Sequence, residues 1–248
     1  MNRPPRAASL ILLLPFLLLC GTLRATADPL DWLNGVRRGA GEHPVQEDLL
    51  LSKTAARWAA RCAAAGILSH RGDDGSTALD RYRSLGGTEV RVGEILGAGP
   101  DIVHVEKGWM ASDEHRRLAL SPGWTHAGYG SAASGPSQVT VMMFTEKLVD
   151  RLLIARSPER LAVTGRFLPP EAKGGILYNG LDRLGPADWE TAGRTFRFEV
   201  PGGLIAGYLR LGYVTNDGRF TLTNAFTWPP GTESPAGEDR FAPPAPSP

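Results

Sequence analysis

The sequence has few cysteines and almost no net charge. Two cysteines, Cys20 and Cys62, occur in 248 residues, too few for a fold that depends on several disulfides. The formal net charge of +1 leaves no basic excess for polyanions, so nucleic acid is excluded as a partner. With 30 glycines, 20 prolines and 42% hydrophobic residues, the composition predicts a globular chain rich in turns and disfavours a helical bundle.

The N-terminus is typical of an exported protein. Arg3 and Arg6 precede an apolar run over residues 7–19, and small residues at positions 25 and 27 fit a signal-peptidase site. We therefore expect residues 1–27 to be a signal peptide and the mature protein, cut after Ala27, to be secreted or periplasmic. The run is shorter than the ~20 residues that span a bilayer, so no transmembrane segment is expected after processing.

The two cysteines have separate interpretations. Lipid attachment at Cys20 is the less favoured alternative, because Leu19 stands where a lipoprotein signal has a small residue. Processing would leave Cys62 without a partner for an intramolecular disulfide. Cys62 continues the helical spacing of Ala55 and Ala59, which favours a small buried apolar side chain over a nucleophile.

The chain changes character near its middle, which predicts an α+β protein. Residues from Asp28 to about Ser121 have helical periodicity, followed by short strands over 127–131 and 139–145. N-cap residues, first-turn proline and terminal glycines set the helix limits. The expected helices run from Asp28 to Gly39, from Asp48 to Ala65, from Thr77 to Gly86, and from Asp101 through Met110.

Alternation replaces helical periodicity after Lys147. Residues 194–200 alternate apolar and polar side chains, as a half-buried strand does. Asn216-Asp217-Gly218 predicts a hairpin turn between two further strands. We expect a first domain of helices and strands over 28–148, a small all-β, sandwich-like module over 156–228, and a Pro-rich disordered tail over 229–248.

Four polar motifs interrupt the helical half. They are Ser69-His70-Arg71, Gly93-Glu94-Ile95, Trp109-x-x-Ser112 and Glu114-His115-Arg116. His70 and Glu94 are 24 residues apart, and Glu94 and His115 are 21 apart, so spacing alone defines no local metal motif.

Taken in order, the motifs resemble those of the CAP superfamily, the cysteine-rich secretory, antigen 5 and pathogenesis-related proteins. This chain is similar to the bacterial, cysteine-poor members. The match covers residues 28–147 and includes Leu33-Asn34-x-x-Arg37, Ser69-His70, Gly93-Glu94-Ile95, Trp109-x-x-Ser112-x-x-His115-Arg116 and His126-Ala-Gly-Tyr-Gly130.

The resemblance implies that the first domain is a CAP (SCP-like) domain, an α-β-α sandwich with a central cleft that holds two histidines and two acids. His70, Glu94 and His115 fall on three of those positions. Three residues of one region are candidates for the position of the second acid: Glu106, Asp113 and Glu114. The sequence departs from the family pattern at Ile95, where an asparagine is usual, and at residues 116–119.

Two interpretations of this cleft stay open. His70 and His115 could bind zinc, with a carboxylate orienting a ring or a bound water. Alternatively, the two histidines and Glu94 could hydrogen-bond one another and fix loops to helices. Arg37 and Arg116 are expected to be structural clamps that donate to backbone carbonyls.

Three classes of function follow. The first is a non-enzymatic exported protein that binds a small ligand, such as a lipid, a sterol or a cell-envelope glycan, or a surface partner. The second is a metal-dependent hydrolase that uses His70, Glu94 and His115. The third places envelope or carbohydrate binding in the C-terminal β module. Fold resemblance does not choose among them.

Overall fold

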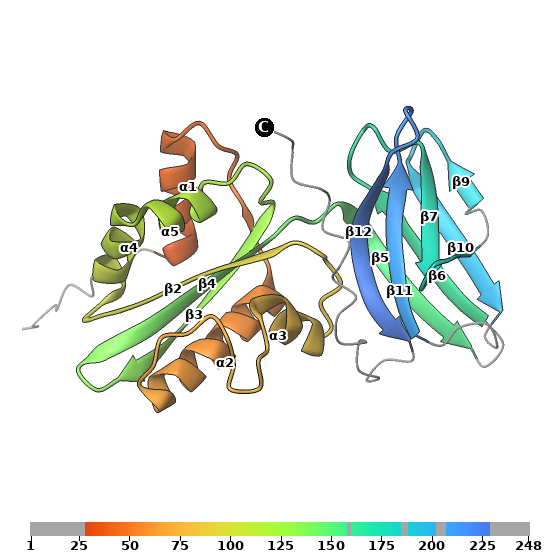
Figure 1. The fold of residues 1–248 in the computed structure, drawn as a ribbon. Coiled ribbons are helices and arrows are strands. Elements are labelled where there is room, and N and C mark those ends of the chain that lie inside the picture. Colours follow the sequence, from red (N-terminus) through yellow and green to blue (C-terminus); the bar gives the residue numbers. More distant parts are fainter. Residues whose placement is uncertain (1–27, 158–159, 185–187, 202–206, 229–248) are drawn as a thin grey trace, which may run out of the picture.

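A computed structural model describes residues 28–157, 160–184, 188–201 and 207–228 (Figure 1). These residues form an N-terminal unit of helices on a sheet and a C-terminal unit of strands. The expected signal peptide, residues 1–27, and the expected Pro-rich tail, residues 229–248, lie outside the described residues. No described helix is long and apolar enough to cross a membrane.

The N-terminal unit has three layers, with one four-stranded sheet between two layers of helices (Figure 1). The strand order is β1-β3-β4-β2, antiparallel except for the parallel β1-β3 pair. The strands are β1 (Gln46–Glu47), β2 (Val92–Gly99), β3 (His126–Ser134) and β4 (Ser137–Thr145). One face carries α1 (Pro29–Gly39), α4 (Ile102–Ala111) and α5 (Asp113–Ala119), and the other α2 (Leu49–Ala65) and α3 (Ala78–Ser84).

The helices begin where capping chemistry predicts. The Asp48 carboxylate accepts from the backbone N–H groups of Leu50 and Leu51 at the start of α2. At its end, Gly66 adopts a left-handed conformation with φ +66°, which glycine takes without the Cβ clash of other residues. Thr77 and Asp80 form the expected capping box of α3.

Strand β4 separates two apolar cores. Met142 and Phe144 point to the side of α1, α4 and α5, whereas Val141 and Met143 point to the side of α2 and α3. All four side chains are fully buried. Both faces of the sheet are covered, which explains why this strand is apolar at consecutive positions instead of alternating.

Glycines let α2 lie directly on β3. A Cβ built at Gly130 would lie 2.2 Å from the Cα of Ala56, and one at Gly128 would lie 2.3 Å from the backbone nitrogen of Ser52. Both glycines belong to the predicted motif that begins at His126. Its glycines therefore serve the close approach of a helix to a strand.

Two features of this half differ from expectation. Strand β2 lies inside the stretch predicted to be helical. Four consecutive residues of this strand are buried and three of its eight residues are glycines, so its sequence shows no clear alternation. The sequence places His115 just past the end of a helix. It lies instead within α5, which starts again at Asp113 after Ser112 leaves the helical conformation with ψ 123°.

The C-terminal unit is built from two antiparallel sheets of four strands, as predicted for a sandwich-like module (Figure 1). The first has the order β5-β6-β10-β9 and the second β12-β11-β7-β8. The strands are β5 (Val149–Ser157), β6 (Arg160–Phe167), β7 (Gly174–Asn179), β8 (Asp182–Leu184), β9 (Asp188–Glu190), β10 (Thr195–Pro201), β11 (Gly207–Val214) and β12 (Phe220–Trp228).

Alternation along β10 is confirmed. Phe196, Phe198 and Val200 are buried between the sheets, whereas Arg197 and Glu199 are exposed. The predicted hairpin turn also forms, with Gly218 at φ +80° between β11 and β12.

The β unit begins at Val149 and not at Arg156, where the sequence places it. Strand β5 pairs with β6, but its register shifts between Asp150 and Leu153, and Arg151 has φ +53°. This irregularity breaks the alternation by which a strand is identified from its sequence.

The two units meet through the loop before β2 and the strand β12. The Ala225 backbone N–H donates to the Thr88 carbonyl at 2.7 Å, and Asn224 Nδ2 donates to Thr88 Oγ1 at 2.9 Å. Glu89 and Asn224 form an isolated antiparallel bridge. The units are therefore joined by hydrogen bonds as well as by the chain between β4 and β5.

Candidate functional site

Glu94 is a buried carboxylate with two cationic partners. It lies on β2, an edge strand of the sheet, between Val92 and Leu96, which both pack toward α2 and α3. Its side chain is 2% exposed. Oε1 lies 2.9 Å from His70 Nδ1, and Oε2 accepts from Arg81 Nη2 at 2.7 Å. Both oxygens therefore have a hydrogen-bond partner, which offsets the cost of burying the charge.

The loop after α2 and helix α3 bring these partners to Glu94. Gly66 ends α2, and the Trp58 indole N–H donates to the Ser69 carbonyl at 2.9 Å, which fixes the loop next to His70. Arg81 follows the capping box of α3 and also donates to the His70 carbonyl at 3.2 Å. Its guanidinium carbon lies 3.7 Å from the Trp58 ring centroid, a cation–π arrangement.

His70 presents its ring to solvent. The His70 side chain is 59% exposed, although its Nδ1 is held by Glu94. The hydrogen bond that His70 donates to Glu94 raises the pKa of His70, while partial burial and the charge of Arg81 act in the opposite direction. With Nδ1 donating to the carboxylate, the other ring nitrogen, Nε2, is available to a ligand.

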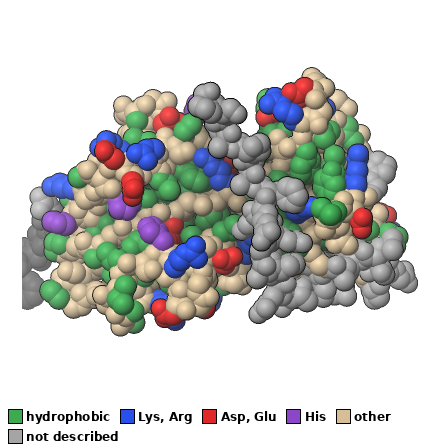
Figure 2. All heavy atoms as spheres, viewed as in Figure 1, with side chains coloured by type: hydrophobic (Ala, Val, Ile, Leu, Met, Phe, Trp, Pro, Cys, Tyr) green, Lys and Arg blue, Asp and Glu red, His purple; other side chains and the backbone are tan. Residues whose placement is uncertain are grey.

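His115 approaches from the opposite layer of helices. It belongs to α5, and its Nδ1 is buried without a hydrogen-bond partner among the described residues. Burial lowers the pKa of His115, and the charge of His70 lowers it further. The two imidazoles therefore interact electrostatically across the edge of the sheet. We call His70, Arg81, Glu94 and His115 the β2-edge site, and Figure 2 shows histidines beside charged side chains on this face.

The three candidates for the second acid lie in different environments. Asp113 is 76% exposed and forms an ion pair with Arg116 at 2.5 Å. Glu114 is exposed, and its charge partly opposes the lowering of the His115 pKa. Glu106 is buried on α4, where burial and then the charge of Asp101 raise its pKa to about 7. None of the three shares a hydrogen bond with Glu94 in the described chain.

The arrangement does not fit a catalytic zinc centre. Such centres use three protein ligands and leave one position open, whereas no three or more His, Cys, Asp or Glu side chains of the described chain are grouped to hold a metal. Glu94 is engaged by His70 and Arg81. Within the part of the chain that the structure describes, the two imidazoles therefore have no third ligand for a metal.

Arg81 is the member of the site that sequence reasoning missed. Its only local signal is its place directly after Asp80 of the capping box, which marks a helix start and no chemistry. The expected clamps are confirmed. Arg37 donates to the carbonyls of His43, Ala119 and Ser121, and Arg116 donates to the Met110 carbonyl.

The family model of the cysteine-rich secretory protein family, CAP, matches residues 30–144. These residues are the three-layered unit that holds the β2-edge site. They are a CAP domain, and through them the chain belongs to that family. The C-terminal β unit lies outside the match.

Part of this chain is similar to several known proteins. YkwD of Bacillus subtilis (strain 168) is 31% identical over 103 residues, which are 41% of this chain and 40% of YkwD. An extracellular protein containing a SCP domain from Bacillus anthracis str. Ames is 22% identical, with a TM-score of 0.45 over 48% of this chain and 39% of that one. An outer surface protein from Borrelia burgdorferi is 18% identical, with a TM-score of 0.45 over 48% of this chain and 89% of that one. This chain therefore spans less than half the length of YkwD.

Proposed function

We propose that this chain is an exported, non-enzymatic binding protein whose CAP domain binds a glycan of the cell envelope at the β2-edge site. The observation that carries the proposal is the exposed His70 imidazole. Its Nδ1 is hydrogen-bonded to the buried Glu94 carboxylate, which also accepts a hydrogen bond from Arg81. A buried, fully paired carboxylate fixes the orientation of the groups around it before any ligand arrives.

The polarity of the site favours a glycan over a lipid or a sterol. Ligands that are mostly apolar bind in concave sites with apolar walls. The side chains that meet here are imidazole, guanidinium and carboxylate groups, which suit the hydroxyl and amide groups of a sugar chain. Export is supported by the leader-like sequence before Asp28 and by the secretory family to which residues 30–144 belong.

The alternative, a metal-dependent hydrolase, predicts a different metal content of the purified protein. Metal analysis of protein prepared without chelator should show no stoichiometric zinc if the proposal is right. Stoichiometric zinc that is lost in the double variant His70→Ala/His115→Ala, with the fold retained, would favour the hydrolase and overturn the proposal.

Cosedimentation with insoluble cell-wall glycan tests the binding itself. The double variant should lower the affinity for glycan by about ten-fold or more, since the His70 ring is the exposed member of the site. His104→Gln is the matched control, because His104 is exposed on α4 outside the site. Unchanged glycan binding by the double variant, or binding to phospholipid and sterol vesicles in place of glycan, would contradict the proposal.

A further inference from the structure

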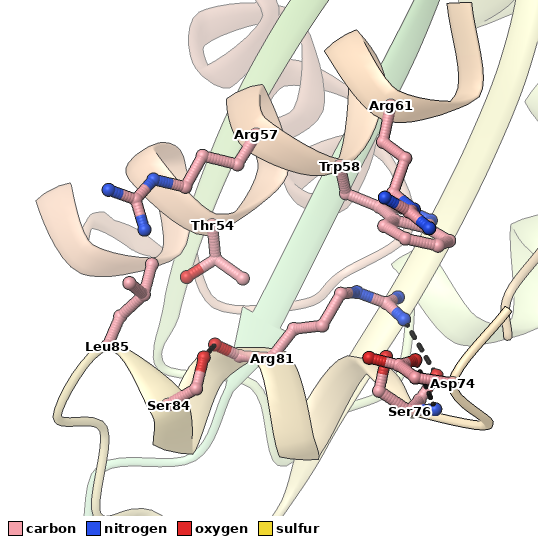
Figure 3. Close-up of a pocket in the computed structure, with 9 residues that line it drawn as sticks. All are labelled: Thr54, Arg57, Trp58, Arg61, Asp74, Ser76, Arg81, Ser84 and Leu85. Carbon is pink, nitrogen blue, oxygen red and sulfur yellow. Dashed lines mark hydrogen bonds between the residues drawn. The ribbon is translucent and has the colours of Figure 1, made fainter. Parts of the chain in front are cut away.

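We infer a second binding site in the CAP domain, a pocket between α2 and α3 that takes a small molecule through a phosphate group. The pocket has a volume of about 240 Å³. Figure 3 shows its lining residues, which come from α2, α3 and the loop between them: Thr54, Arg57, Trp58, Arg61, Asp74, Ser76, Arg81, Ser84 and Leu85. Its size is below the ~300 Å³ at which pockets for drug-sized ligands begin, so it suits a small anion.

Three guanidinium groups line this α2–α3 pocket. Arg57 and Arg61 are one turn apart on α2, and Arg81 lies on α3 across the pocket. In Figure 3 the guanidinium groups of Arg61 and Arg81 lie at the same end of the pocket, beside Trp58, and that of Arg57 points toward Leu85 at the other end. Asp74 is the only acid among the lining residues, and its Oδ1 already accepts from the Ser76 backbone N–H at 2.9 Å. Arginine forks match the oxygens of a phosphate group in geometry as well as in charge.

Neither of the two α2 arginines is held by a buried partner among the described residues. Arg57 has no ion-pair or hydrogen-bond partner among the described residues. Arg61 pairs with Asp73 at 2.5 Å, but the two side chains are 57% and 88% exposed. An ion pair between exposed side chains adds little stability, so a bound phosphate can replace Asp73 as the partner of Arg61.

Arg81 supplies a rigid wall with an unsatisfied donor. Its side chain is 12% exposed and is held by Glu94, by the carbonyls of His70 and Ser76, and by the Trp58 ring. Its Nε is buried without a partner among the described residues. A buried donor without a partner is costly, so a small movement of the Arg81 side chain that brings Nε to a ligand oxygen would be favoured.

Arg81 belongs to both sites, so the α2–α3 pocket and the β2-edge site should be coupled. An anion beside Arg81 offsets its positive charge, which acts against protonation of His70. Phosphate in the pocket should therefore raise the pKa of His70. By thermodynamic reciprocity, protonation of His70 should tighten phosphate binding by the same factor.

The test is titration of the full chain with inorganic phosphate and with phenyl phosphate at constant ionic strength, followed by calorimetry and by the NMR signal of the Trp58 indole. We expect saturable binding with a Kd below about 10 mM. The double variant Arg57→Gln/Arg61→Gln should weaken that binding by about ten-fold or more. Arg117→Gln is the matched control, because Arg117 is exposed on α5, away from the lining residues.

The probes also identify the source of the phosphate group. Tighter binding of phenyl phosphate indicates a phosphate ester that fills the pocket with its organic part, whereas equal binding indicates the free ion. Either result supports the inference if the double variant Arg57→Gln/Arg61→Gln binds the probe more weakly than the wild type does. Equal affinity in wild type, double variant and control, or no saturable binding of either probe, would overturn the inference. Glycan binding is measured separately, so the failure of one proposal does not decide the other.

Discussion

Arg37 and Ala119 are 82 residues apart in the sequence, and Arg37 Nη1 donates a hydrogen bond of 2.6 Å to the Ala119 carbonyl. The same guanidinium donates to the carbonyls of His43 and Ser121, and the side chain is fully buried. One arginine therefore fixes the end of α1, the loop that follows it and the end of α5. These contacts hold the layer that carries His115.

Replacing Arg37 should destabilise the CAP domain strongly. Arg37→Met keeps much of the apolar stem but leaves three carbonyls without their donor, with an expected loss of about 3 to 5 kcal/mol in the free energy of unfolding. Arg37→Lys should rescue little, since an ammonium group does not reproduce the planar fork. Urea unfolding measures both losses. Arg38→Ala, at the exposed neighbour, is the control, and an equal effect of the two substitutions would refute the clamp.

The pKa values of the two histidines of the β2-edge site should be shifted in opposite directions. NMR titration should place the pKa of His70 above its ordinary value of 6.5 and that of His115 below it. Glu94→Gln should lower the pKa of His70, because it removes the charge of the main hydrogen-bond partner. Two histidines that both titrate at the ordinary value would contradict the described geometry.

The effects of these shifts on stability have opposite signs. The folded state binds the His70 proton more tightly than the unfolded state does, so the His70 contribution is complete below pH 6.5 and is lost as the pH rises through the raised pKa. His115 resists protonation in the folded state. Its contribution is complete above pH 6.5 and is lost as the pH falls through the lowered pKa. The free energy of unfolding of each histidine variant, measured as a function of pH on both sides of pH 6.5, would separate the His70 contribution from the His115 contribution.

Gly130→Ala should disrupt the packing of α2 on β3. The added Cβ would lie 2.2 Å from the Ala56 Cα and 2.3 Å from its backbone nitrogen, so the backbone must move, at an expected cost of about 1 to 3 kcal/mol or more. Gly35→Ala is the matched control, because a Cβ on Gly35 in α1 meets nothing within 4 Å. That helical substitution should stabilise by about 0.5 to 1 kcal/mol. Thermal unfolding compares the two, and a neutral Gly130→Ala would disprove the close approach.

Phe198 should be a main support of the β unit. It is 1% exposed and packs on Phe196 with ring centroids 5.9 Å apart. Phe198→Ala should cost about 3 to 5 kcal/mol. Arg197→Ala, at the neighbouring position with a side chain 54% exposed, should cost under about 1 kcal/mol. Comparable losses at both positions would mean that β10 does not have the described orientation.

Sequence patterns predicted the elements that carry local signals. The helix limits followed from capping residues such as Asp48 and Thr77, and β10 followed from strict alternation. Strand β2 was missed because burial on both faces removes alternation, and β5 was missed because a register shift interrupts it. Long-range packing determines both strands, and no short stretch of sequence records it.

The candidate site was predicted in part. The family motifs selected His70, Glu94 and His115, and the structure shows the contact between the first two. Arg81 was not identified, because its role depends on how α3 lies against β2 and Trp58. The electrostatic relation between His70 and His115 likewise comes from two opposite layers of helices. The edge of the sheet brings them near each other, and spacing along the chain does not contain that information.

The contact of Thr88 with Asn224 and Ala225 has a consequence for the order of folding. Asn224 and Thr88 are 136 residues apart, and β12 is the last described strand to be synthesised. The CAP domain can therefore form its own core before the junction exists, whereas the junction forms only after β12 has been synthesised. A nascent or truncated chain that lacks β12 would present β11 as an open sheet edge, a surface prone to pairing with other chains. Formation of this junction thus requires that both described units have been synthesised.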